Sequence, residues 1–207
     1  MAMEWLSRKK ERDQQRAAVA HRIPPGQELT DKWPVLHYGD VPSFTPERWD
    51  FTITGLVAHP QRWTYEQFSK LPHVTETYDI HCVTGWSKLD NTWEGVRVRD
   101  LLRPATVLPK GQFVMVHGDE DYTTNVPLSL LLQEGALIAN KHNGEPLTPE
   151  HGWPYRLVVP GPYFWKSAKW VRGLELMETN ERGFWERYGY HNDGDPWKEE
   201  RYSWQER

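Results

Sequence analysis

The chain has 207 residues, 38% of them hydrophobic and 26% charged, which suits one domain, or at most a domain with a small appendage, and excludes both a disordered chain and a membrane span. Its net charge of −4 argues against a nucleic-acid binder, because such proteins normally carry an excess of basic residues. Cys82 is the single cysteine, which excludes a disulfide framework within the chain and any zinc or iron–sulfur site built from several cysteines.

Three parts are predicted along the chain: a charged arm over 1–22, a domain over 23–178, and an aromatic, charged tail over 179–207 that wraps the domain surface. Apolar alternation and short apolar runs predict strands over 49–57, 77–83, 113–117, 136–139, 155–159 and 169–177. Short helices are predicted over 64–72, 98–102 and 127–132; Thr64 and Gln67 have capping-box spacing in the first, and Pro104 ends the second.

The order of these elements differs from the regular strand–helix alternation of a doubly wound fold, because single short helices interrupt the strands at irregular spacing. The content of 12 Trp, 15 Gly and 16 Pro likewise favours short strands and long ordered loops around pockets over a helical bundle. The first ten residues lack the apolar core of a secretory signal and a twin-arginine pair, so we expect a cytoplasmic protein whose cysteine stays reduced.

Cys82 is the first candidate for chemistry, in a chain without a Gly-rich phosphate loop, a GxSxG elbow, an HExxH pair or a Walker pattern. It lies near the end of the predicted strand 77–83, on the face of Tyr78 and Ile80, and polar residues follow it. A cysteine where a strand opens into a loop is well placed for a site. A buried cysteine that acts as a small hydrophobe fits the same pattern, so both interpretations stay open.

A cationic cluster is the second candidate. The turn over 151–154 can present backbone amides, and Arg156, Lys166 and Lys169 follow it with donors suited to a phosphate. Three surface cations beside a strand pair would give the same pattern.

The third candidate is His117 with Asp119 and a later histidine, His142 or His151. This is the residue set of a non-haem iron site, and a solvated acidic turn is the alternative interpretation.

Five stretches together resemble a known family: Asp-Ile-His-Cys-Val-Thr-Gly-Trp-Ser over 79–87, Trp-Glu-Gly-Val over 93–96, Leu-Leu at 101–102, Asp-Tyr-Thr-Thr-Asn over 121–125, and the long run over 143–170. They are similar, in the same order, to the molybdenum-binding core of the sulfite oxidase family, across roughly residues 23–178. The similarity is strongest to the small bacterial branch that includes the methionine-sulfoxide reductase catalytic subunit. The resemblance implies a mixed α+β fold with mostly short strands in several small sheets, and short helices.

The resemblance also implies one molybdenum, held by the dithiolene of a molybdopterin and by the sulfur of Cys82. A thiolate suits this role because it is a soft, electron-donating ligand, and a thiol loses its proton when a metal binds. The residues that the resemblance places at the pterin or its phosphate are Leu36, His37, Tyr38, Gly39, Asp119 (or its neighbour Gly118), His151, Arg156, Ser167, Ala168 and Lys169.

The implied activity is two-electron oxygen-atom transfer on a small molecule, with an unidentified electron donor or acceptor, and with Cys82, Trp86 and Tyr122 as catalytic residues. Ser87 stands where sulfite oxidases have a sulfite-binding arginine, and Leu36 replaces another arginine. We therefore expect a neutral S- or N-oxide as substrate, since a dianion without cationic partners is costly to bury. The alternatives are a sulfite-oxidising enzyme, a non-redox relative that binds the cofactor, and the iron oxygenase above.

Overall fold

The computed structural model describes residues 17–206, so most of the predicted arm over 1–22 lies outside the described residues. The strands of this part are β1 (Glu28–Leu29), β2 (Asp50–Gly55), β3 (Gln61–Thr64), β4 (Val74–Cys82), β5 (Trp86–Arg97), β6 (Phe113–Gly118), β7 (Thr123–Pro127), β8 (Leu137–His142), β9 (Glu145–Pro146), β10 (Arg156–Val158) and β11 (Val171–Met177). The α-helices are α2 (Tyr65–Ser69), α3 (Val98–Ala105), α4 (Leu128–Leu131) and α5 (Phe184–Arg187).

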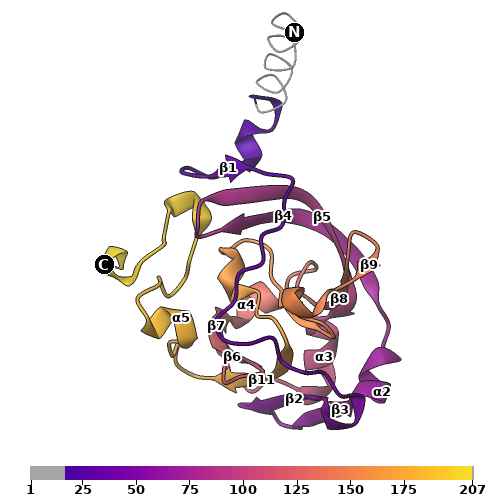
Figure 1. Ribbon diagram of the computed structural model, residues 1–207. Coiled ribbons are helices and arrows are strands. Elements are labelled where there is room, and N and C mark those ends of the chain that lie inside the picture. The colour runs from indigo at the N-terminus through magenta and orange to yellow at the C-terminus, as the bar shows by residue number, and fades with distance from the viewer. Residues whose placement is uncertain (1–16, 207) are drawn as a thin grey trace, which may run out of the picture.

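Two sheets organise the domain. The first has six strands, along the path β1-β5-β8-β10 with β4 paired to β5 and β9 paired to β8. The second has five strands in the order β3-β2-β11-β6-β7, in which β11 runs parallel to β2 and antiparallel to β6. Figure 1 shows the long β4–β5 hairpin arching around the molecule, with the C-terminal segment beside it. The predicted α+β fold of short strands, small sheets and short helices is confirmed.

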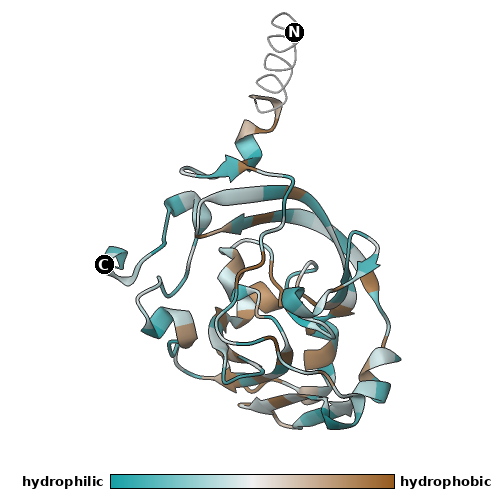
Figure 2. Ribbon diagram, viewed as in Figure 1, coloured by the Kyte–Doolittle hydropathy of each residue, from teal (hydrophilic) through white to brown (hydrophobic). Residues whose placement is uncertain are grey.

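The interior consists of two apolar clusters. The larger one contains Phe51 and Ile53 of β2 and Phe68 of α2, each 0% exposed, because the alternation of β2 turns these side chains inward. The smaller one lies between β4, β5 and β8, around Ile80 and Trp93. Figure 2 shows hydrophobic residues concentrated around α3 and α4 and hydrophilic ones along the C-terminal segment. No helix within 17–206 is long and apolar enough to cross a membrane.

The predicted elements are present with shifted bounds: β2, α2, α4, β10 and β11 are shorter than predicted, and β4, α3, β6 and β8 are longer. Thr64 and Gln67 form the predicted capping box at the start of α2, since each side chain bonds the other's backbone N–H. The prediction that Pro104 ends its helix at residue 102 is wrong, because α3 continues to Ala105. Proline is tolerated there since only one hydrogen bond of the last turn is lost, and the helix ends where Thr106 turns left-handed, with φ 54°.

Five strands were not predicted: the short β1, β3 and β9, and the longer β5 and β7. In β5 the alternation is interrupted at Asp90, whose φ is 55°, and at the irregularity between Glu94 and Gly95. A side chain at Gly95 would meet the carbonyl of Ile138 on β8, so glycine is required for the close pairing of these strands. The β4–β5 hairpin positions the candidate site, because its turn, residues 83–85, directly follows Cys82.

Candidate active site

A cavity of about 420 Å³ lies where the β4–β5 turn, the segment over 33–38 and the loop over 164–170 meet. Its volume is in the range of cofactor and small-ligand pockets. Eleven of the sequence-predicted site residues line it: Leu36, His37, Tyr38, Cys82, Trp86, Asp119, Tyr122, Arg156, Ser167, Ala168 and Lys169. Gly39 and His151 are not on its wall, although His151 stacks on Trp33, which is. The fold thus brings together side chains that are distant in the sequence.

The thiol of Cys82 is on the wall of this cavity, and the residue is 8% exposed. Its sulfur lies 3.1 Å from the hydroxyl oxygen of Thr84. Burial raises the pKa of the thiol, while the Thr84 hydrogen bond and the nearby Arg201 oppose this effect. Arg201 reaches back from the C-terminal tail and donates to the carbonyl of Val83, which holds the turn that carries Cys82. The cysteine is thus a buried, protonated thiol whose sulfur a soft metal can take once the proton leaves.

Arg156 is a buried cation without an acidic partner. The residue is 1% exposed, and its guanidinium donates to the carbonyls of His151, at 2.9 Å, and Ser167, at 2.8 Å. It forms no ion pair with any carboxylate of the described residues, and its Nε atom has no hydrogen-bond partner. Burial lowers its pKa to about 9, which still leaves it charged at neutral pH. An unpaired buried charge is expensive, so the arrangement suits an anionic ligand.

Aromatic rings surround this guanidinium. Its central carbon lies 4.4 Å from the ring centre of Phe164, 5.4 Å from that of Trp33 and 5.7 Å from that of Trp93. The rings exclude water and contribute cation–π attraction, which stabilises the charge in part. Trp33 and Phe164 were not identified as site residues from the sequence, because aromatic residues outside a periodic element carry no distinguishing signal among 12 tryptophans.

His151 and Lys169 extend the polar side of the site. His151 stacks on Trp33, and its Nε2 atom is buried without a partner. Lys169 lines the cavity and donates to the carbonyl of Glu150 at 2.5 Å. Burial, with the neighbouring Arg156, lowers the Lys169 pKa to about 7. Arg156 and Lys169, both of which the resemblance places at the pterin or its phosphate, thus lie in the same cavity wall.

Asp119 and His117 do not form the iron site that the sequence left open. Asp119 pairs with Arg172 at 2.9 Å, and the Nε2 atom of His117 lies 2.9 Å from Glu175. Among the described residues, neither belongs to a group of three side chains that could share a metal. The iron hypothesis is therefore wrong for this structure, because both side chains already have other partners.

The remaining wall is aromatic and includes Trp86, Tyr122 and Trp165. Tyr122 donates its hydroxyl hydrogen to the carbonyl of Trp165 at 2.9 Å, and burial raises its pKa well above the ordinary value, so it keeps its proton. Ser87 and Lys88, which follow Trp86 in β5, are not among the residues that line the cavity. Ser87 is 0% exposed and bonds His81 at 2.8 Å, and Lys88 donates to Asn91 at 2.9 Å.

The C-terminal tail also contributes to the cavity, through Phe184, Trp185 and Tyr190. The sequence predicted a tail that wraps the surface, without a part in the site. Its density of aromatic residues was the available signal, but an aperiodic segment does not show which cavity its rings will face.

These features fit a molybdopterin cofactor. A phosphate and a dithiolene are anionic, and the site offers Lys169 together with Arg156, which has no carboxylate partner within residues 17–206. The unpartnered Nε atom of Arg156 and Nε2 atom of His151 leave donors or acceptors for a polar ring system. The single thiol on the wall, Cys82, is the donor that a molybdenum would take.

Comparison with known proteins agrees with this chemistry. The family described as "Oxidoreductase molybdopterin binding domain" matches residues 38–185, and the chain belongs to this family. It is therefore an oxidoreductase with a molybdopterin cofactor, and the predicted family, fold and cofactor are confirmed.

Three similar proteins illustrate the range of the family. The uncharacterized oxidoreductase YuiH of Bacillus subtilis is 50% identical over 184 residues, 88% of this chain and 93% of that protein. The putative protein-methionine-sulfoxide reductase subunit YedZ1 of Azospira oryzae is 26% identical over 171 residues, 81% of this chain and 65% of that protein. In structure, the chain resembles the sulfane dehydrogenase SoxCD of Paracoccus pantotrophus, with a TM-score of 0.64 and 25% identity, over 74% of this chain but only 43% of that one.

Proposed function

We propose that this protein reduces small neutral S- or N-oxides by two-electron oxygen-atom transfer, with Cys82 as the protein ligand of molybdenum. In the reaction, a sulfoxide, two electrons and two protons give the corresponding thioether and water; an N-oxide gives the amine and water in the same way. The bound molybdenum supplies the redox chemistry, and the protein supplies binding, orientation and a shaped cavity. The electrons come from a donor protein or small molecule that is not yet identified.

The distribution of charge in the cavity supports a neutral substrate over an anionic one. Among the lining residues described, the lysine and arginine side chains are Arg156 and Lys169, and both suit the anionic cofactor. Ser87 and Lys88, which follow the metal-ligand turn, point to other partners. A compact dianion such as sulfite would then lose its hydration without gaining a cation of its own, which is costly. A neutral oxide does not carry this cost.

The aromatic residues of the wall shape the space for that oxide. We assign Trp86 as a wall residue beside Cys82, and Tyr122 as a protonated donor that holds the Trp165 carbonyl and thereby the loop over 164–166. His151, Arg156 and Lys169 hold the cofactor, with Ser167, Ala168, His37 and Leu36 on the same wall. The relative named as a methionine-sulfoxide reductase subunit supports a sulfoxide as the substrate class.

The test is a substrate comparison on enzyme loaded with molybdenum and pterin, both quantified by mass spectrometry. Reduction of dimethyl sulfoxide and trimethylamine N-oxide by a reduced viologen dye is compared with oxidation of sulfite by ferricyanide, as kcat/KM. We expect the oxides to be preferred, and we expect Cys82→Ser to abolish all turnover. A clear preference for sulfite would overturn the proposal in favour of a sulfite-oxidising enzyme.

The cytoplasmic location expected from the sequence stays a prediction. Cell fractionation tests it.

A further inference from the structure

A buried ion pair joins the C-terminal tail to the domain next to the cavity. Lys166 and Glu186 lie 2.6 Å apart, with side chains 2% and 0% exposed. Neither side chain lines the cavity. A buried pair of charges gives little net stability compared with apolar packing, and its clearest attested use is to specify one arrangement of the parts that it joins. Here the pair joins the loop over 164–166 to α5 of the tail.

The carboxylate of Glu186 holds the indole of Trp165. Its Oε1 atom accepts a hydrogen bond from the Trp165 Nε1 atom at 2.8 Å and another from the Thr124 hydroxyl at 3.0 Å. Trp165 lines the cavity, and so does Trp185, the neighbour of Glu186 in the chain. One carboxylate therefore anchors two wall residues, one by a hydrogen bond and one through the backbone.

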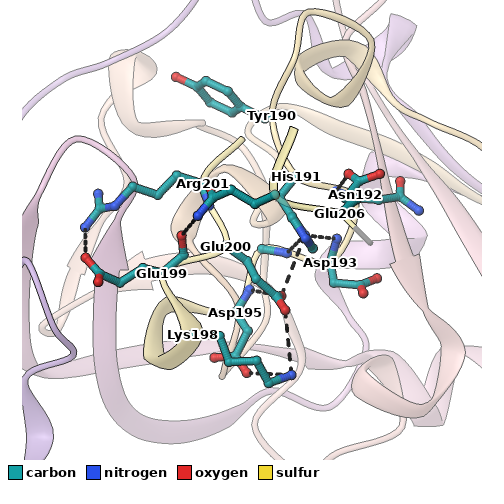
Figure 3. Close-up of polar contacts among 12 residues, drawn as sticks. Tyr190, His191, Asn192, Asp193, Asp195, Lys198, Glu199, Glu200, Arg201 and Glu206 are labelled. Carbon is teal, nitrogen blue, oxygen red and sulfur yellow. Dashed lines mark hydrogen bonds and ion pairs between the residues drawn. The ribbon is translucent and has the colours of Figure 1, made fainter. Parts of the chain in front are cut away.

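Tyr190 connects the same rings from the tail. Its ring centre lies 5.0 Å from that of Trp165 and 5.4 Å from that of Trp185. The ammonium group of Lys166 donates to the carbonyl of Asn192, at 2.7 Å. Glu206 accepts from the backbone N–H of Asn192 at 2.6 Å, and Figure 3 shows Glu206, Asn192 and Tyr190 together in the tail. The segment that carries Tyr190 is thus held by contacts of Glu186 before it and of Asn192 after it.

Lys166, the other member of the ion pair, is bound to a strand of the second sheet. Lys166 also donates to the backbone and side-chain oxygens of Asn125, both at 2.9 Å, and Asn125 is in the middle of β7. The ion pair therefore ties the tail to a strand of the second sheet. The family match ends at residue 185, so Glu186, Tyr190 and Asn192 lie just beyond the matched range.

From this geometry we infer that Glu186 is a positioning residue: by accepting the hydrogen bond from the indole it holds Trp165 in the aromatic wall, and this wall limits the size of the oxide that the cavity admits. The choice of oxide as substrate rests on the proposed function, whereas the fixing of Trp165 does not. Without the Glu186 acceptor, the indole is free to change its rotamer, and bulkier substrates enter.

Two matched double variants test the inference. Lys166→Met/Glu186→Gln and Lys166→Met/Glu186→Leu both remove the charge pair, so neither leaves an unpaired buried charge. Only glutamine keeps a carbonyl oxygen for the indole N–H of Trp165. For each variant, kcat and KM are measured for dimethyl sulfoxide and for methyl phenyl sulfoxide. We expect the glutamine variant to keep the wild-type ratio of kcat/KM values, and the leucine variant to shift it at least fivefold toward the aryl substrate, through KM. Equal ratios in the two variants would overturn the inference.

A second measurement needs no turnover. Protein labelled with 5-fluorotryptophan gives one fluorine NMR resonance for Trp165, which Trp165→Phe identifies by its disappearance. We expect this resonance to stay in place in the glutamine variant and to shift or broaden in the leucine variant. Trp165→Phe, which lacks the indole N–H, should relax the size limit by itself and covers the case that the leucine variant does not fold. If the Trp165 resonance moves in the leucine variant but the enzyme does not reduce oxides, only the proposed function is refuted. If the enzyme reduces oxides but the resonance stays in place in the leucine variant, only this inference is refuted.

Discussion

The imidazole of His151 stacks on the indole of Trp33, with ring centres 3.8 Å apart and an interplanar angle of 25°. His151 ends the short 3₁₀ helix Pro149–His151 before β10, and Trp33 belongs to the segment between β1 and β2, so the contact joins two distant parts of the chain. The Nδ1 atom of His151 lies 3.0 Å from the Thr148 hydroxyl. The ring is therefore held on its face and on one edge, while Nε2 has no partner.

This relationship makes Trp33 a residue for cofactor retention. We expect Trp33→Ala to lower the pterin bound per protein several-fold, because His151 loses its stacking surface and Arg156 loses one of its rings. Trp33→Phe keeps an aromatic face and is expected to retain most of the cofactor. Pterin is released and measured by fluorescence after oxidation. Equal pterin content in the alanine and wild-type proteins would contradict the prediction.

Cys82→Ser is expected to remove molybdenum while the fold persists. The hydroxyl of serine is a poor soft-metal ligand, and the change affects one small side chain at the cavity wall, so the free energy of unfolding should change by only about 1 kcal/mol. Metal content is measured by elemental mass spectrometry and stability by thermal unfolding. Thr84→Val is the matched control, since it removes the hydroxyl beside the sulfur but leaves the thiol in place. Full metal content in the serine variant would refute the assignment.

Anion binding at Lys169 is expected to weaken as the pH rises. The Lys169 pKa is lowered to about 7 by burial, so the ammonium form that an anion needs is depleted above that pH. One linked proton gives up to about a tenfold loss of affinity per pH unit. Sulfate is a suitable probe, since its charge is constant between about pH 6 and 9, and calorimetry on cofactor-free protein measures its affinity.

The control for this experiment is Lys169→Arg, whose guanidinium stays charged and should flatten the pH profile. The stability of the cofactor-free protein should run in the opposite direction. A lysine whose folded pKa is lowered favours unfolding while it is protonated, so this contribution to stability grows as the pH rises from about 7 toward the ordinary lysine pKa, 10.5. A pH profile of sulfate affinity that is the same for both proteins would exclude Lys169 as the titrating group.

Ser87→Arg is expected to destabilise the protein without creating a sulfite site. Ser87 is 0% exposed, between the His81 ring and the side chain of Gln27, and its side chain is not on the cavity wall. An arginine there buries an unpaired charge, at a cost on the order of 3 kcal/mol or more, equivalent to roughly a 6–12 °C lower Tm. Ser87→Ala, which loses only hydrogen bonds, should cost about 1 kcal/mol. A stable arginine variant that gains sulfite oxidation would contradict the structural placement of Ser87.

Several features of the fold were predictable from local sequence, since they depend on contacts within a few residues. The alternation around Phe51 and Ile53 predicted β2, and the spacing of Thr64 and Gln67 predicted the start of α2. β5 was not predictable in this way, because the left-handed Asp90 and the irregularity at Gly95 interrupt its period. Its conformation is stabilised by pairing with β4 and β8, which are other parts of the chain.

The sequence by itself determined which chemical groups the protein has for its cofactor: one thiol at Cys82, and the cations Arg156 and Lys169 in motifs that resemble a molybdopterin-binding family. Only the tertiary structure decided how these groups are used. It left Arg156 without a carboxylate, bonded Ser87 to His81 away from the cavity, and brought the tail residue Glu186 to Trp165. The physical reason is that burial and pairing depend on long-range packing, and the same side chain is a surface charge or an anion site according to what surrounds it.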